Sequence, residues 1–180
     1  MKIRSTTILG VRVGRKIALG GDGQVTLGDM QLKSKAIKVR EFNNGKVLAG
    51  FAGAAADAMA LFEKFELKLD ETGGNLQRAV VEMAKDWRMD KILRELDALL
   101  AIMDNKNAFI LSGTGDVIEP DNNIISIGSG SGYAISAARA FIQTGEKDPA
   151  KIVLNSLEIT ADLCIYTNDK ITVLGNKWKI

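Results

Sequence analysis

The stretch Thr6–Gln24, TTILGVRVGRKIALGGDGQ, decides how this chain begins to fold. Two runs rich in β-forming residues, Thr7–Val13 and Lys16–Leu19, are separated only by Gly14-Arg15. Two residues are enough to connect antiparallel strands, and a glycine tolerates the positive φ angle of such a tight turn. The stretch therefore predicts a β-hairpin, and a short Gly-Asp-Gly segment follows its second strand.

The rest of the chain alternates between runs of β-forming residues and apolar residues at helical spacing. Further strands are expected at Lys46–Phe51, Asn107–Ser112, Val117–Ile118, Ile124–Ile127 and Ile171–Leu174. Helices are expected at Ala55–Leu69, Gly132–Gln143 and Pro149–Leu163. Another is expected along an apolar stripe from Leu76 to Trp87, which continues through Ile92, Leu96 and Leu99 to Met103. Helix pairs between runs of antiparallel strands favour layered α+β structure over the alternating units of a parallel sheet. We therefore predict an α+β fold of four layers, an αββα sandwich.

Composition narrows the possible chemistry. The 180 residues carry a formal net charge of +2, which is too even a balance to predict a nucleic-acid or membrane partner. The chain has no histidine, which excludes Ser-His-Asp and Cys-His catalysis, and its one cysteine, Cys164, excludes an intramolecular disulfide. A single cysteine and the lack of an export signal fit a cytoplasmic protein. Catalysis would have to use hydroxyls, amines, carboxylates and backbone amides.

Thr6 is a candidate nucleophile on one condition. Threonine is common in strands, and most threonines have no catalytic role. If the chain were cut between Ser5 and Thr6, Thr6 would carry both a hydroxyl and a free α-amine with a pKa of about 7.7–8. An amine that titrates near neutral pH can act as a general base without any histidine.

Charged residues that could support such a nucleophile follow the hairpin. The small residues around Asp22 would let its carboxylate approach another backbone and orient an ammonium group, although Gly20–Gln24 also suits an ordinary polar turn. The basic residues Lys33, Lys35, Lys38 and Arg40 come next. A solvated face explains them, but one lysine drawn inward would lower the pKa of a nearby amine. Their spacing does not identify which lysine that is.

Two glycine-rich segments, Ala49–Gly53 and Gly128–Gly132, each lead from an expected strand into an expected helix. Their backbone N–H groups could bind an oxyanion, and Ser129 is positioned to donate a hydrogen bond. Taken singly, each segment is better explained by close packing of a strand against a helix. Neither GxxxxGK[ST] nor GxGxxG occurs in the chain, so no nucleotide site is expected.

Taken in order, these motifs resemble those of one family. They are Thr-Thr-Ile at 6–8, Gly-Asp-Gly-Gln-Val-Thr-Leu-Gly at 21–28, the lysine cluster, Ala-Gly-Phe-Ala-Gly at 49–53, Lys-Asp-Trp-Arg at 85–88, Gly-Ser-Gly at 128–130 and Cys-Ile-Tyr-Thr-Asn at 164–168. The series resembles the HslV (ClpQ) family of bacterial proteasome-like peptidases, which are N-terminal-nucleophile threonine peptidases. The resemblance runs from about Thr6 to Asn168 and implies the αββα fold of the N-terminal-nucleophile hydrolases.

The resemblance implies a threonine-type endopeptidase with Thr6 as its nucleophile. Self-cleavage would remove the leader Met1–Ser5 and leave residues 6–180 as a single peptidase domain. The supporting roles that the resemblance assigns are Asp22 to orient the threonine, Lys38 to hold its amine and hydroxyl in their reactive state, the Gly50 amide as oxyanion donor and Ser129 as an accessory serine near the amine.

The resemblance also implies a cation and partners. Backbone carbonyls of Ala161, Cys164 and Thr167 would bind a monovalent cation, usually sodium, and Ala161 stands where the family usually has glycine. The family forms two stacked six-membered rings that an HslU-type AAA+ ATPase activates and supplies with protein substrates. ATP would be used by that partner only.

Two other functions stay open at this level. A ring subunit of the same fold would be catalytically silent if the Ser5–Thr6 bond stayed intact. A small-molecule or phosphate-binding module could instead use the glycine-rich segments.

Overall fold

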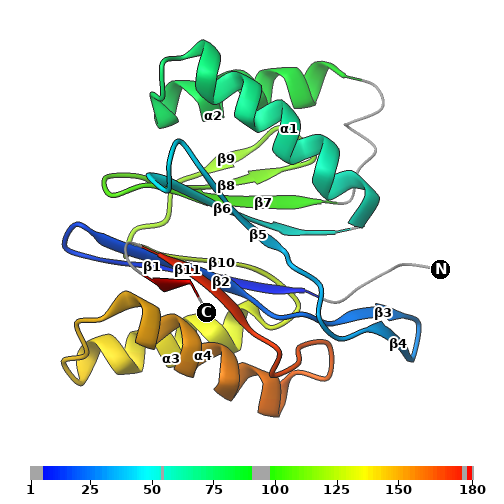
Figure 1. Ribbon diagram of the computed structural model, residues 1–180, viewed down its shortest axis with the longest axis vertical. Coiled ribbons are helices and arrows are strands. Elements are labelled where there is room, and N and C mark those ends of the chain that lie inside the picture. The colour runs from blue at the N-terminus through cyan, green and yellow to red at the C-terminus, as the bar shows by residue number, and fades with distance from the viewer. Residues whose placement is uncertain (1–5, 54, 91–97, 176–177, 180) are drawn as a thin grey trace.

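The computed structural model describes residues 6–53, 55–90, 98–175 and 178–179. Two sheets pack face to face, and a pair of helices covers the outer face of each sheet (Figure 1). Helices α1 (Ala55–Glu71) and α2 (Leu76–Met89) cover one sheet, and α3 (Ser131–Gln143) and α4 (Pro149–Leu163) cover the other. The predicted αββα architecture is confirmed.

Neighbouring strands within both main sheets are antiparallel. The first sheet has the order β10-β1-β2-β11-β12, with β1 Thr7–Val13, β2 Lys16–Gly21, β10 Ile124–Gly128, β11 Thr172–Gly175 and β12 Trp178–Lys179. The second has the order β5-β6-β7-β8-β9, with β5 Val39–Phe42, β6 Val47–Ala52, β7 Leu99–Met103, β8 Ala108–Ser112 and β9 Val117–Ile118. A separate hairpin joins β3 (Val25–Leu27) to β4 (Met30–Lys33).

Strand β1 is buried on both faces, which explains its nearly continuous apolar sequence. Side chains of a strand point alternately to its two faces. Ile8 accordingly packs between the two sheets, while Leu9 packs between the first sheet and helices α3 and α4. The predicted hairpin is confirmed, with Gly14 at a φ of 61° in its turn.

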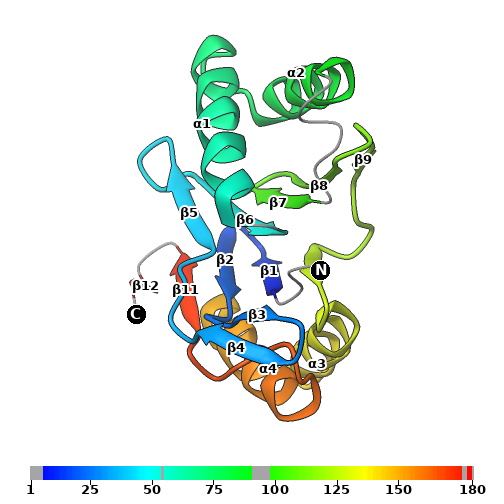
Figure 2. The same cartoon turned by 90° about the vertical axis from the view of Figure 1, so that its right-hand side faces the viewer.

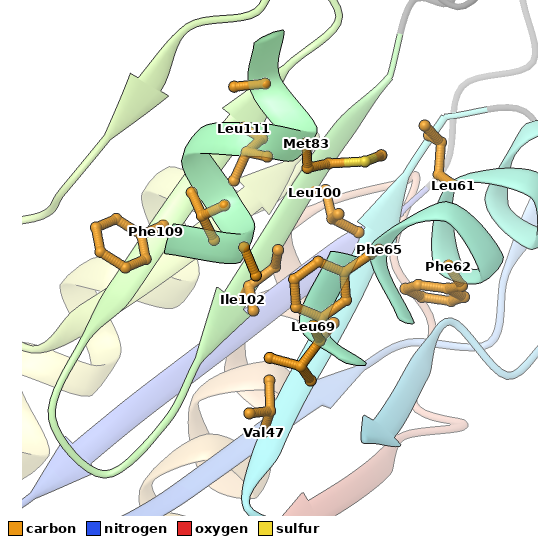
Figure 3. Close-up of a cluster of buried hydrophobic side chains, with 14 of the residues drawn as sticks. Val47, Leu61, Phe62, Phe65, Leu69, Met83, Leu100, Ile102, Phe109 and Leu111 are labelled. Carbon is orange, nitrogen blue, oxygen red and sulfur yellow. The ribbon is translucent and has the colours of Figure 1, made fainter. Parts of the chain in front are cut away.

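A further core lies between the second sheet and its helices. Figure 3 shows Phe65 and Leu69 of α1 and Met83 of α2 packed over Leu100 and Ile102 of β7. These side chains are almost completely buried. Burial of one such side chain contributes about 1.5–3 kcal/mol, so this core makes α1 and α2 part of the same folded unit as the sheets.

One expected helix was extended too far. The stripe Leu76–Trp87 lies in α2 as predicted, but its expected continuation is wrong at Leu99–Met103, which forms β7. Ile92 and Leu96 lie outside the described residues. Strand β7 is buried on both faces, and an uninterrupted apolar run does not distinguish such a strand from a buried helix. Its residues contribute alternately to the two cores that flank the second sheet.

The β3–β4 hairpin and the separate strand β5 were not predicted. Figure 2 views the end of the sandwich at which this hairpin projects, beside the end of β2. Each of these strands has only three or four residues, and apolar alternation over so short a run is a weak signal. Among the described residues, no helix combines the length and the apolar character that crossing a bilayer requires.

Candidate active site

Four of the predicted catalytic residues gather at one end of the sandwich, and the fifth, Gly50, pairs with Val39, the residue after Lys38. Thr6 directly precedes β1, Asp22 follows β2, Lys38 precedes β5 and Ser129 follows β10. Because β1 pairs antiparallel with both β2 and β10, its start lies beside the ends of both neighbours. Strand pairing in the first sheet therefore brings together segments that are far apart in the sequence.

The carboxylate of Asp22 is the centre of the site. Its Oδ1 accepts hydrogen bonds from the backbone amide of Thr7, at 2.8 Å, and from Nζ of Lys38, at 3.0 Å. Its Oδ2 accepts from the amides of Gln24, at 2.9 Å, and Asn168, at 3.4 Å. The side chain is 0% exposed. A buried carboxylate requires such partners, so the surrounding chain is organised around this charge.

Lys38 is the lysine that turns inward. Its side chain is 7% exposed, and its Nζ donates to Oδ1 of Asp22 and to the carbonyl of Gln24, the latter at 2.5 Å. Burial lowers the pKa of Lys38 below its usual value, and the charge and hydrogen bond of Asp22 oppose part of that effect. The other basic residues of the cluster, Lys33, Lys35 and Arg40, are exposed. The structure thus selects the residue that spacing left open.

Thr6 is buried beside this pair. It is 5% exposed, and its carbonyl oxygen accepts a hydrogen bond of 2.8 Å from the amide of Ser129. The next residue, Thr7, donates its amide to Asp22 as described above. Ser129 is itself exposed, and its backbone amide contacts Thr6. Thr6 is thus held between the end of β10 and the Asp22–Lys38 pair.

The close approach predicted around Asp22 is present. A Cβ atom on Gly23 would lie 2.4 Å from the carbonyl oxygen of Ser34, so no larger residue fits there. Asn168 was not foreseen as part of this arrangement. Its Oδ1 accepts from the Gly23 amide at 3.0 Å, and its Nδ2 donates to the Ser34 carbonyl at 3.0 Å. Its place in the Cys-Ile-Tyr-Thr-Asn motif was the only sequence signal for it.

Gly50 lies in the middle of β6, paired with Val39 of β5 and Ala101 of β7. The amide of Phe51 donates to the carbonyl of Lys38 at 3.1 Å and so points toward β5. Successive amides along a strand point to opposite neighbours, and the Gly50 amide therefore points toward β7. The role of that amide as oxyanion donor stays a prediction.

The three residues predicted to bind a cation lie at and beyond the end of α4. Ala161 is in the last turn, Cys164 is the C-cap residue, and the amide of Thr167 donates to the Cys164 carbonyl at 2.9 Å. The last carbonyls of a helix lack intrahelical partners and carry partial negative charge, so the donor chemistry fits a hard cation. The helical backbone at Ala161 has no positive φ, so alanine is accommodated where the family usually has glycine.

Comparison with known proteins extends the similarity over nearly the whole chain. A family model described as "Proteasome subunit" matches residues 3–174. The ATP-dependent protease subunit HslV of Caldicellulosiruptor saccharolyticus is 55% identical over 171 residues, which is 94% of this chain and 97% of the relative. HslV of Pseudothermotoga lettingae is 53% identical over 173 residues, which is 96% and 98% of the two chains.

A solved structure is similar in fold as well. The crystal structure of eukaryotic HslV from Trypanosoma brucei aligns with a TM-score of 0.88 at 42% sequence identity. The alignment covers 94% of this chain and 98% of that chain. The similarity therefore includes both sheets and both helix pairs.

Proposed function

Because this chain belongs to the proteasome subunit family and is the threonine-type proteolytic subunit of an ATP-dependent protease, we propose that it cuts peptide bonds with Thr6 as the nucleophile. One observation carries this assignment. A single buried carboxylate oxygen, Oδ1 of Asp22, contacts both the Lys38 ammonium and the amide of the residue that follows Thr6. That oxygen couples the position of Thr6 to a nearby positive charge.

The proposed chemistry uses the two functional groups of a mature Thr6. Its α-amine, directly or through a water, takes the proton of its hydroxyl, and the oxygen attacks the carbonyl carbon of the substrate peptide bond. That bond breaks, the proton passes to the departing amine, and an ester links the acyl group to Thr6. Water then hydrolyses the ester and releases the second product.

Lys38 and Asp22 have separate tasks in this proposal. The charge of Lys38 disfavours protonation of the nearby amine and stabilises negative charge on the threonine oxygen. Asp22 holds both Lys38 and the peptide after Thr6 by hydrogen bonds. Ser129 holds the Thr6 carbonyl through its amide, and we assign its hydroxyl to the surroundings of the amine.

The amine exists only if the Ser5–Thr6 bond is broken. Removal of methionine alone would not expose Thr6, so we propose self-cleavage that releases Met1–Ser5. Those residues lie outside the described part of the chain. The single peptidase domain would then comprise residues 6–180.

Substitution of Thr6 tests the assignment. Thr6→Ala removes the hydroxyl and should abolish peptide hydrolysis while the protein still assembles. Thr144→Ala, at an exposed position after α3, is the matched control and should leave hydrolysis unchanged. Hydrolysis of a short fluorogenic peptide measures both variants, and full activity of Thr6→Ala would reject Thr6 as the nucleophile.

We further propose the assembly and partner that the relatives' names suggest. Each of the two curated relatives is named as a subunit of an ATP-dependent protease, which supports an oligomer that works with an ATPase. The specific proposal is a cytoplasmic particle of two stacked hexameric rings, activated by an HslU-type AAA+ ATPase that delivers unfolded proteins. Sedimentation of the purified protein tests the rings, and equal peptidase rates with and without the ATPase would contradict the activation.

A sodium ion at the end of α4 is also part of the proposal. The carbonyls of Ala161, Cys164 and Thr167 would hold it, and the ion would supply a fixed positive charge there. The side chain of Thr167 contacts that of Thr7 at 2.7 Å between their hydroxyl oxygens. The turn that would bind the ion is therefore joined to the start of β1.

A further inference from the structure

The peptide unit that joins Thr6 to Thr7 is held at both of its polar atoms. Its carbonyl oxygen accepts from the Ser129 amide at 2.8 Å, and its N–H donates to Oδ1 of Asp22 at 2.8 Å. A peptide unit is planar, and the plane includes the Cα atom of its first residue. The two hydrogen bonds therefore determine where the Cα of Thr6 lies, and this atom carries the amine and the side chain.

Gly128 makes the first of these hydrogen bonds possible. It is paired with Thr7 in the first sheet and has a φ of 94°. A Cβ atom built on Gly128 would lie 2.0 Å from the carbonyl oxygen of Thr6 and 2.8 Å from its carbonyl carbon. Non-bonded contacts of a Cβ below 3.0 Å essentially do not occur, and these two atoms are main chain rather than a flexible side chain.

We propose that Gly128 is a positioning residue for the nucleophile. Its lack of a side chain lets the Gly128–Ser129 backbone lie against the Thr6 carbonyl and orient the peptide plane that carries Thr6. The inference rests on the proposed role of Thr6. It adds a residue outside the predicted site, and it gives the Ser129 amide a role distinct from that of its hydroxyl.

A side chain at residue 128 would displace the peptide unit that carries Thr6. The Thr6 carbonyl would have to move away from residue 128, and the plane would turn about its remaining bond to Asp22. A displacement of about 1 Å at a reacting group can cost about 100-fold in rate. Because the displaced atoms belong to the nucleophile, kcat should fall while KM stays nearly unchanged.

A matched pair of variants separates this effect from backbone strain. Gly128→Ala introduces both a left-handed alanine and the collision with Thr6. Gly145→Ala introduces the same strain alone, because Gly145 has a φ of 96° and open space where its Cβ would be. Each full-length variant is purified, its assembly and melting temperature are measured, and kcat and KM are determined for a short peptide. Thr6→Ala is measured alongside.

The expected result is a loss in kcat of about 100-fold for Gly128→Ala, with KM within about two-fold of the unsubstituted protein. Gly145→Ala should stay within about two-fold in both constants. Nearly normal kcat in Gly128→Ala, or an equal loss in both glycine variants, would overturn the positioning role. Activity in Thr6→Ala would instead overturn the proposed function, whatever the glycine variants do.

A second measurement decides the matter if Gly128→Ala does not assemble. Hydrogen exchange of the assembled, unsubstituted protein reports on the amides of Thr7 and Ser129, which donate the two hydrogen bonds. Both amides should be strongly protected. Exchange of either at the rate of an unstructured peptide would show that the plane is not held, and the inference would be wrong.

Discussion

Gly50 and Gly128 lie in strands that each lead toward a helix, yet the fold uses the two glycines differently. A Cβ at Gly50 would lie 2.5 Å from the side chain of Ile8, in the core between the sheets. A Cβ at Gly128 would lie 2.0 Å from the main-chain carbonyl of Thr6. A side chain can repack, whereas this carbonyl belongs to the proposed nucleophile. The missing side chain therefore serves packing at Gly50 and positioning at Gly128.

A pair of charged side chains also joins the two sheets. Lys38 directly precedes β5 of the second sheet, and its partner Asp22 follows β2 of the first sheet. The hydrogen bonds around Asp22 therefore join the two sheets at the same end as Gly128. Gly50 of β6 pairs with Val39, the residue after Lys38, but a Cβ on Gly50 would face the apolar side chains of Ile8 and Leu19. Substitutions at the strand ends should affect catalysis, and substitutions inside the strands should affect stability.

The largest effect in this scheme is expected for Lys38→Met. Loss of its charge removes the group that keeps the threonine amine unprotonated, and kcat should fall by about 10²–10⁴-fold. Lys33→Met is the matched control, because Lys33 belongs to the same basic cluster but is exposed. Peptide hydrolysis by the two variants measures the difference. Equal activities would show that the buried ammonium has no special role.

Gly50→Ala should affect stability first. Its extra methyl group enters a filled core beside Ile8, and such overpacking typically costs about 1–3 kcal/mol. Denaturant unfolding measures this loss. Its kcat should change less than that of Gly128→Ala when both are corrected for folded protein. A larger kcat loss at Gly50 than at Gly128 would reverse the comparison drawn above.

The lowered pKa of Lys38 predicts a pH effect on stability. The unfolded chain keeps this proton up to about 10.5, whereas the folded chain releases it at lower pH. The unfolded state therefore binds more protons between the two values, and the unfolding free energy contributed by Lys38 rises with pH in that interval. This contribution is measured as the difference in unfolding free energy between the unsubstituted protein and Lys38→Met, followed from neutral pH toward 10.5. If the unfolding free energy of the unsubstituted protein, relative to that of Lys38→Met, fell with rising pH, the burial effect on Lys38 would be contradicted.

The smallest effect is expected far from the site, at Asp148. Its Oδ1 accepts from the amide of Ala150 at 3.0 Å and caps the first turn of α4. Asp148→Ala should lower the unfolding free energy by about 0.5–2 kcal/mol and leave kcat unchanged. Thermal melting and peptide hydrolysis report the two quantities. A loss of kcat as large as that of Gly128→Ala would mean that stability alone governs activity.

Local sequence signals predicted much of this fold. The hairpin Thr7–Leu19 followed from β-forming runs around a short turn, and Pro149–Leu163 matches α4 as the structure has it. The boundary between α2 and β7 could not be predicted from the sequence, because an apolar run is compatible with a helix or a buried strand. The strands of the β3–β4 hairpin have only three and four residues, so their apolar alternation is too short to stand out in the sequence.

The site was predicted as a set of residues but not as a geometry. Asp22 and Thr6 stood out through their motifs, whereas the choice of Lys38 among its neighbours depends on which side chain the fold buries. Gly50 and Gly128 lie in similar glycine-rich segments, and only φ angles and strand register separate their roles. Such quantities arise from long-range pairing, which spacing along the chain does not encode.

The intact mass of the purified, active particle tests the central claim most directly. A free amine on Thr6 requires that Met1–Ser5 be absent, so the account predicts chains that begin at Thr6. Blocking that amine with a mild acylating reagent should abolish hydrolysis. A particle that digests proteins while every subunit retains Met1–Ser5 would contradict the account.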